Sequence, residues 1–242
     1  MRNMFPVSSI DVYNNGTLRI RRSAPLFANK DQPFIMPGKR GRVANLSTKS
    51  LARLAFVSRE TLTNFEHFAT LTYPHAFPGD GRQCKTDLNR HLGWLRRRNM
   101  SYLWFLEFQT RGAPHYHVFI AGYNGDRVGH AKSWARASTK DETAYRQSLS
   151  VHTRRRFLEP IISKDGAARY ATKYALKTNQ KAVPRKYTNC GRFWGCSTDV
   201  MNNLPTPGRV DVTEHEIREF LRDKCHPAWN WDILPTYIFL ND

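Results

Sequence analysis

Two stretches of alternating polar and apolar residues flank a short loop, and this pattern constrains the fold more than any other feature. Residues 102–109 read YLWFLEFQ, residues 115–120 read HYHVFI, and residues 110–114 separate them. Because side chains alternate between the two faces of a strand, the pattern predicts two strands joined as a hairpin. Five residues is a common length for a hairpin loop. We therefore expect an antiparallel sheet at the centre of the chain.

Other segments with strand or helix periodicity supply the rest of the fold. In residues 67–73, Ala69, Leu71 and Tyr73 alternate with Thr70 and Thr72. The order strand, helix, hairpin, strand, helix predicts an α+β domain in which helices back an antiparallel central sheet. The expected strands are 67–73 and 157–162, and the expected helices are 47–59, 86–98, 164 onward and 211–223.

Polar residues gather on one face of the expected hairpin. His115 and His117 point to the face opposite Tyr116. A symmetric loop would pair Glu107 with His117 and Gln109 with His115, on that same face. Two imidazoles and one carboxylate can hold a metal ion that polarises a substrate oxygen, so we predict that His115, His117 and Glu107 form a metal site. The alternative is that the two histidines are only surface polarity.

A second candidate group lies in residues 170–177, YATKYALK. Helical spacing places Tyr170, Lys173, Tyr174 and Lys177 on one stripe. A phenol is a poor nucleophile at neutral pH, but an adjacent ammonium group favours its phenolate or the anionic phosphate that it attacks. The alternative is a half-buried packing stripe whose lysines extend to solvent.

Charge points to a polyanionic partner. The chain has 38 Lys and Arg against 20 Asp and Glu, a formal net charge of +18. Several basic clusters in one chain favour a nucleic-acid surface over an ordinary solvated face. The residues that we assign to DNA binding are Arg96, Arg97, Arg98, Arg111, Arg154, Arg155, Arg156 and Lys177.

Composition divides the chain into three parts. Residues 1–60 form a basic extension with one helix and carry 11 basic against 3 acidic side chains. Residues 61–200 form the main domain. Residues 201–242, with 4 basic and 7 acidic side chains, are expected to pack on that domain or to bind a partner.

Location and cysteine use are less informative. Apolar runs are too short to span a bilayer and no signal peptide is evident, so we expect a cytoplasmic protein that does not contact a membrane. Buried thiols are the ordinary interpretation of the four cysteines. A zinc site from Cys190, Cys196, Cys225 and His226 is the alternative.

Three motifs together carry a family resemblance. FATLTYP (68–74), RGAPHYHVFI (111–120) and RYATKYALK (169–177) resemble the three motifs of HUH endonucleases, in the order found there. They look most like the two-tyrosine rolling-circle replication initiators of small single-stranded DNA bacteriophages and related replicons. The resemblance implies an HUH fold with a ferredoxin-like core that is also found in RNA-recognition domains.

The same resemblance implies an activity. His115 and His117 would hold Mg²⁺ or Mn²⁺, Tyr170 would attack single-stranded DNA at an origin, and Tyr174 would serve a second cleavage and joining. The products would be a 5′-phosphotyrosine and a free 3′-hydroxyl. The expected partners are single-stranded DNA, an origin hairpin or duplex, and a host helicase and polymerase in a bacterial cytoplasm. A fused helicase is not expected, because the chain has no phosphate-binding G-x-x-x-x-G-K-[S/T] motif.

Two alternatives are kept beside this hypothesis. One is a single-strand DNA transposase of the same superfamily that works through one tyrosine, against which Tyr174 argues. The other is a non-catalytic nucleic-acid-binding module. Ala113 and Pro114 stand where an RNA-recognition motif requires an aromatic residue, and this argues against that module.

Overall fold

The structure is a computed structural model that divides into two compact units by its internal contacts. One unit is Met1–Gly38 together with Pro205–Asp242, and the other is Lys39–Leu204. We describe each unit by itself. The structure describes residues 8–14, 16–21, 47–61, 64–74, 76–154, 157–162, 183–224 and 237–239.

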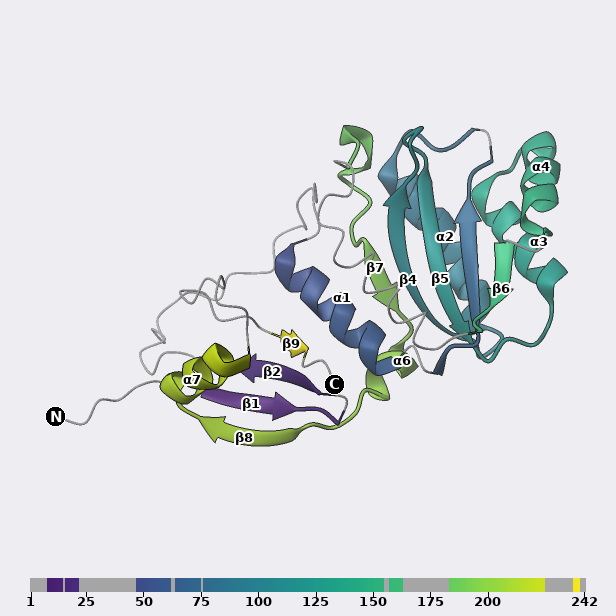
Figure 1. The fold of residues 1–242 in the computed structure, drawn as a ribbon. Coiled ribbons are helices and arrows are strands. Elements are labelled where there is room, and N and C mark those ends of the chain that lie inside the picture. The colour runs from purple at the N-terminus through teal and green to yellow at the C-terminus, as the bar shows by residue number, and fades with distance from the viewer. Residues whose placement is uncertain are drawn as a thin grey trace, which may run out of the picture. The chain divides into compact units, whose positions relative to one another are not determined.

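The larger unit is built on a five-stranded antiparallel sheet with strand order β6-β3-β5-β4-β7 (Figure 1). The β4–β5 hairpin contributes two adjacent strands, as the sequence predicts. Strand β3 pairs on the other side of β5, and β7 pairs on the other side of β4. The bounds are β3 His67–Thr72, β4 Ser101–Phe108, β5 Pro114–Ala121, β6 Leu158–Pro160 and β7 Trp194–Cys196.

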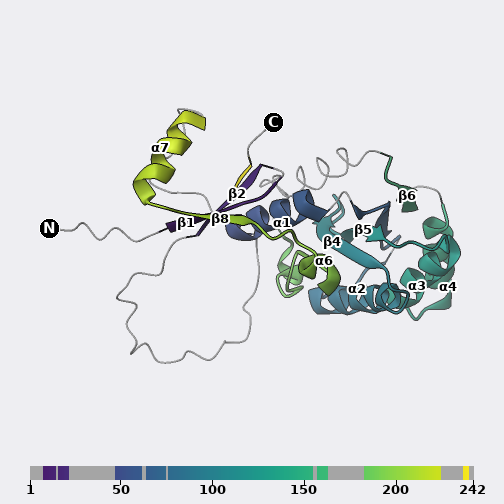
Figure 2. The same cartoon turned by 90° about the horizontal axis from the view of Figure 1, so that it is seen from below.

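Helices cover one face of this sheet. Figure 2 shows α2, α3 and α4 on the same side of the strands. Leu88 and Leu92 of α2 and Trp134 of α3 pack with Tyr116 and Val118, which β5 points to that side. The helices and turns of this unit are α1 Thr48–Thr61, α2 Gly81–Arg96, α3 Arg127–Ser138, α4 Glu142–His152, the 3₁₀ turn η3 Arg185–Tyr187, and α6 Thr198–Asn202.

Most predicted elements of this unit are confirmed, with shifted ends. The expected helix 86–98 begins earlier, at Gly81, after the turn at Asp80. The helices α3 and α4 have no counterpart in the sequence prediction, which left 121–156 unassigned. Their first turns are capped by carboxylates, because Asp126 accepts a hydrogen bond from Gly129 N and Asp141 accepts one from Ala144 N. The helix expected from residue 164 lies outside the described residues.

The smaller unit joins the two ends of the chain. Its antiparallel sheet has the order β8-β1-β2-β9, so strands near the N-terminus pair with strands near the C-terminus. Leu18, Ile20, Ile217, Leu221 and Ile238 form its apolar core. The elements are β1 Ser8–Val12, β2 Thr17–Arg21, β8 Gly208–Val212, α7 Glu214–Lys224 and β9 Tyr237–Phe239.

This pairing was not anticipated by the division into 1–60, 61–200 and 201–242. The helix expected at 47–59 is α1 of the larger unit, and the acidic segment supplies β8 and α7 to the smaller unit. The expected helix 211–223 is corrected at its start, because residues 211–212 pair with β1 before α7 begins at Glu214. In the described part of the chain, no helix is both long and apolar enough to cross a membrane.

Candidate functional site

The β4–β5 hairpin carries most of the predicted site, but in a register different from the predicted one. Glu107 pairs with His115, and Phe105 pairs with His117. The predicted pairing of Glu107 with His117 is therefore wrong, and its true partner is the other histidine. The reason lies in the loop: Gln109 N donates to Ala113 O, so only residues 110–112 turn, and Gly112 takes the left-handed conformation (φ 77°) that such short loops require.

The predicted polar residues nevertheless meet on one face. Nε2 of His117 lies 2.9 Å from Oε2 of Glu107, and Nδ1 of His115 lies 3.2 Å from Nε2 of Gln109. The two imidazole rings have centroids 4.6 Å apart. A side chain as long as Glu reaches its diagonal neighbour across a sheet, so the register changes the pairing without separating the group.

Strand β3 completes this face with residues that the sequence did not assign to the site. Thr70 pairs with His117, and Thr72 pairs with His115. Gln109 Nε2 donates to Oγ1 of Thr72 (3.2 Å), which links all three strands. The alternation in residues 67–73 placed both threonines on one face, but only the pairing of β3 with β5 shows which neighbours they have.

Two phenyl rings fix the orientation of His117. Phe68 of β3 stacks on its ring with centroids 5.4 Å apart, and Phe105 of β4 stacks with centroids 4.9 Å apart. His117 is only 4% exposed. Its environment is therefore apolar on both ring faces, which strengthens electrostatic interactions made by its ring nitrogens.

His115 is neutral at physiological pH. Burial, and after it the neighbouring His117, lower its pKa to about 4, although the charge of Glu107 acts in the opposite direction. A neutral imidazole keeps a lone pair that can bind a metal ion. The same residue is held from the helical layer by way of Thr72, because Thr72 N donates to Nε2 of His152 on α4 (3.2 Å).

The donor set of this face fits a divalent cation. Two ligands placed side by side in octahedral coordination, each about 2.1 Å from the ion, lie about 3 Å apart, and Glu107 and His117 have that separation. Within the described residues, however, no group of three or more His, Cys, Asp or Glu side chains already has the geometry of a metal site. That finding also covers Cys190 and Cys196, whereas Cys225 and His226 lie outside the described residues.

The predicted DNA-binding arginines separate into two places. Arg111 lies beside the histidines, where its Nε donates to Oε1 of Gln109 (2.9 Å) and its Nη2 donates to Tyr73 O. Arg97 and Arg98 instead line a hollow of about 420 Å³ between α2 and α3, on the helical layer. Arg96 donates to Oη of Tyr102 (2.6 Å).

Several predicted residues remain without a structural test. Arg154 is exposed, and its carbonyl oxygen accepts a hydrogen bond from Arg127. The two arginines that follow it and all four residues of the tyrosine stripe lie outside the described residues. These are Arg155, Arg156, Tyr170, Lys173, Tyr174 and Lys177.

Comparison with known proteins gives one match. No curated protein and no solved structure matches this chain significantly. One family model, described as a replication-associated protein of the ORF2 type, matches residues 66–179. The matched segment contains β3, the β4–β5 hairpin with His115 and His117, and residues 169–177. This segment therefore belongs to a family of rolling-circle replication initiators.

Proposed function

We propose that this replication-associated protein nicks and rejoins single-stranded DNA at an origin. The observation that carries the proposal is the convergence of His115, His117 and Glu107 on one face of the sheet, inside the segment that matches the initiator family. The charge of +18 supports a DNA partner. A host helicase and polymerase complete the expected set of partners.

His115, His117 and Glu107 are the residues that would hold Mg²⁺ or Mn²⁺. When bound, such an ion supplies neutralisation of the charge that grows on a phosphate oxygen during its displacement. The chain's own residues prepare this position: the His115 imidazole is neutral, and Phe68 and Phe105 fix the His117 ring in a site with little water. Arg111, which Gln109 positions beside His115, can hold a neighbouring phosphate.

We assign the nucleophiles to Tyr170 and Tyr174. Attack by a phenol oxygen forms a bond to phosphorus and breaks the bond from phosphorus to the 3′ oxygen. The phenol loses its proton and the departing 3′ oxygen gains one, so the products are a 5′-phosphotyrosine and a 3′-hydroxyl. Lys173 and Lys177 stand one turn apart on the same predicted stripe and would stabilise the phenolate or the phosphate charge.

The test is covalent capture of DNA. The protein is mixed with Mn²⁺ and a pool of single-stranded oligonucleotides with a randomised central segment, labelled at either the 5′ or the 3′ end. The 3′ label should become attached to the protein in a denaturing gel, and the 5′-labelled fragment should be extendable by a polymerase. Adduct formation should survive in at least one of Tyr170→Phe and Tyr174→Phe and vanish in the double variant. An adduct in the double variant, or undiminished cleavage in EDTA, would contradict the proposal.

A further inference from the structure

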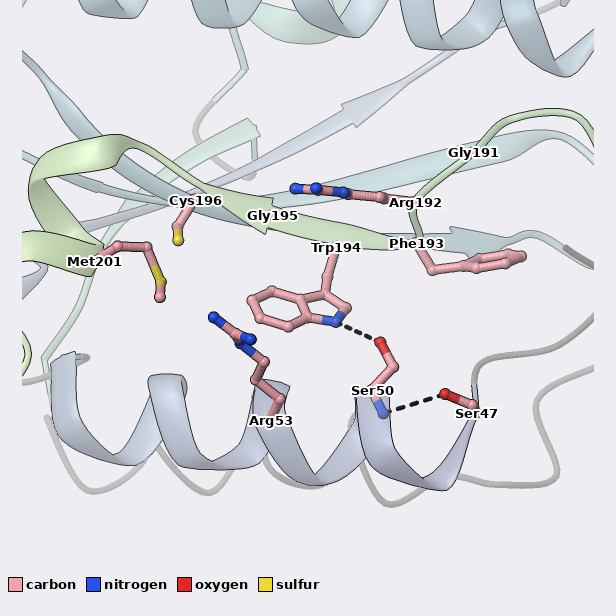
Figure 3. Close-up of a pocket in the computed structure, with 10 residues that line it drawn as sticks. All are labelled: Ser47, Ser50, Arg53, Gly191, Arg192, Phe193, Trp194, Gly195, Cys196 and Met201. Carbon is pink, nitrogen blue, oxygen red and sulfur yellow. Dashed lines mark hydrogen bonds between the residues drawn. The ribbon is translucent and has the colours of Figure 1, made fainter. Parts of the chain in front are cut away.

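A second hollow lies between the first half of α1 and strand β7 (Figure 3). Its volume is about 500 Å³, within the range of pockets that hold small organic ligands. Strand β7 stands at the end of the strand order, so the hollow lies at an edge of the sheet. The side chains that matter for its chemistry are Ser50, Arg53, Arg192, Trp194, Cys196 and Met201.

The hollow opens on the same face of the sheet as the histidines. Phe105 of β4 pairs with His117 on one side and with Trp194 on the other. Directly paired residues point to the same face, so His117, Phe105 and Trp194 form one row across three strands. Two strand spacings separate His117 from Trp194, about 10 Å. The hollow therefore lies beside the candidate site and shares none of its residues.

Its charge is positive. Arg53 on α1 and Arg192 before β7 are both exposed, and within the described residues neither has a hydrogen-bond or ion-pair partner. Burial raises the pKa of the Cys196 thiol to about 11, whereas the charges of Arg53 and Arg192 lower it. Both guanidinium groups therefore lie near one thiol, at one end of the hollow. A ligand with a negative charge fits this arrangement.

Its aromatic residue is held in a fixed orientation. Nε1 of Trp194 donates to Oγ of Ser50 (2.9 Å), and Ser50 N in turn donates to Oγ of Ser47 at the start of α1 (3.2 Å). Figure 3 shows the indole reaching from β7 toward α1, with Arg53 rising beside it. An indole that is already oriented loses little freedom when a base stacks on it, and stacking accepts any base.

We propose that this hollow binds one nucleotide of the DNA strand, next to the nucleotide at His115 and His117. Its base would stack on Trp194, and its phosphate would contact Arg53 and Arg192. The identity of the strand as the nicked DNA rests on the proposed function, whereas the binding of single-stranded DNA by the hollow can be measured without cleavage.

The first test measures binding of the full chain to a fluorescein-labelled oligodeoxythymidine by anisotropy, in EDTA and over a series of salt concentrations. Each phosphate contact on a single strand contributes about 0.7 to the salt slope, so Arg53→Ala/Arg192→Ala should lower the slope by about 1.4. The matched control is Arg82→Ala/Lys140→Ala, which removes two exposed cations outside the hollow and should leave the slope unchanged. Equal effects of the two double variants would overturn the proposal.

The second test concerns the aromatic platform. Trp194→Ala should weaken binding at least about fivefold, and Trp194→Phe should restore most of the affinity because it keeps a ring. Because Trp194→Ala could affect folding, the unmodified protein is also cross-linked by light to an oligonucleotide that contains 5-iododeoxyuridine. The cross-linked peptide should contain Trp194. Cross-links confined to other peptides would contradict the assignment.

Two further outcomes separate the possible ligands and the two proposals. If ATP or thymidine monophosphate occupies the hollow while Arg53→Ala/Arg192→Ala leaves oligonucleotide binding unchanged, the site takes free nucleotides and the proposal fails. If binding depends on the hollow but no covalent adduct ever forms, the proposed nicking function fails and this inference stands. If cleavage is normal and binding does not depend on the hollow, this inference fails and the nicking function stands.

Discussion

Glu107 pairs with His115 in the β4–β5 ladder, yet its Oε2 atom lies 2.9 Å from Nε2 of His117. The carboxylate thus reaches diagonally to the more buried histidine, and Gln109 takes the position beside His115. The two acceptor side chains therefore have different duties toward the two imidazoles.

This division of duties predicts different losses. Glu107→Ala should abolish Mn²⁺-dependent cleavage, because it removes a proposed ligand. Gln109→Ala should weaken Mn²⁺ binding only about tenfold, because it removes an interaction that orients His115. Mn²⁺ binding to the DNA-free protein, followed by electron paramagnetic resonance, checks both effects without relying on activity. A larger loss in Gln109→Ala would mean that the amide, and not the carboxylate, completes the site.

The hairpin loop gives a second prediction. Gly112 has φ 77° and a Cβ added there would meet nothing within 4 Å, so Gly112→Ala should cost about 1 kcal/mol of stability from backbone strain alone. Because Gln109 and Arg111 adjoin it, cleavage should fall as well. Gly125→Ala is the matched control, since Gly125 has φ 84° and equal space in a loop away from the histidines. Urea unfolding and initial cleavage rates should show similar destabilisation but unequal loss of activity.

How far the sequence predicts this structure depends on the range of the interactions. Local alternation predicted the strands of the hairpin and the shared face of His115, His117 and Glu107, because the two-residue period is a property of each strand. The register failed because it depends on one residue, Gly112, whose left-handed conformation shortens the loop. A count of loop residues cannot distinguish that turn from a symmetric one.

Non-local pairing explains most of what the sequence did not predict. Nothing in residues 1–60 indicates that β1 pairs with β8, about two hundred residues later. Trp194 lies in a three-residue strand that is too short for a periodic signal, and only its pairing with Phe105 brings it to the face of His117. The nucleophile assignments to Tyr170 and Tyr174 remain predictions.

Buried histidines predict a loss of stability in mild acid. His91, His130 and His152 are fully buried side by side, and burial lowers their pKa values, to about 3 for His130 and about 4 for His152. An unfolded histidine titrates near pH 6.5, so below that pH the unfolded chain binds more protons than the folded one. Stability is full above pH 6.5 and should fall as pH drops toward 4, by about 1.4 kcal/mol per pH unit for each histidine.

Urea unfolding at pH 7.5 and pH 5 would measure this fall. His130→Leu should lessen the pH dependence by one histidine's share, because both ring nitrogens of His130 lack a hydrogen-bond partner among the described residues. The exposed His215 is the control, and His215→Ala should leave the dependence unchanged. A stability that does not vary between these pH values would contradict the burial argument.

The smaller unit depends on one carboxylate. Asp11 is fully buried and accepts hydrogen bonds from Arg21 and from Arg209 (2.9 Å), which lie on the strands either side of β1. Burial raises its pKa, but these arginines lower it more, so the group is ionised at neutral pH. Asp11→Ala should destabilise this unit by about 2 kcal/mol. Hydrogen exchange of β2 and β8 measures it, with the exposed Asp211→Ala as a control that should change little.

The hollow between α2 and α3 gives the last prediction, which concerns DNA affinity and not chemistry. Arg97 and Arg98 were assigned to DNA from sequence, and the structure adds Lys132 and Arg136 from the facing helix. Four cations on two helices can follow a phosphate backbone, whereas Arg96 is engaged by Oη of Tyr102.

We therefore expect Lys132→Ala/Arg136→Ala to weaken DNA binding about as much as Arg97→Ala/Arg98→Ala, with a salt slope lowered by about one to two units on duplex DNA and no change in the cleavage rate at saturating DNA. Arg96→Ala should have a smaller effect on the slope. Anisotropy titrations at several salt concentrations would distinguish these variants. If Lys132→Ala/Arg136→Ala binds like the unmodified protein, the cations of α3 belong to a solvated surface, and the arginines after α2 act without them.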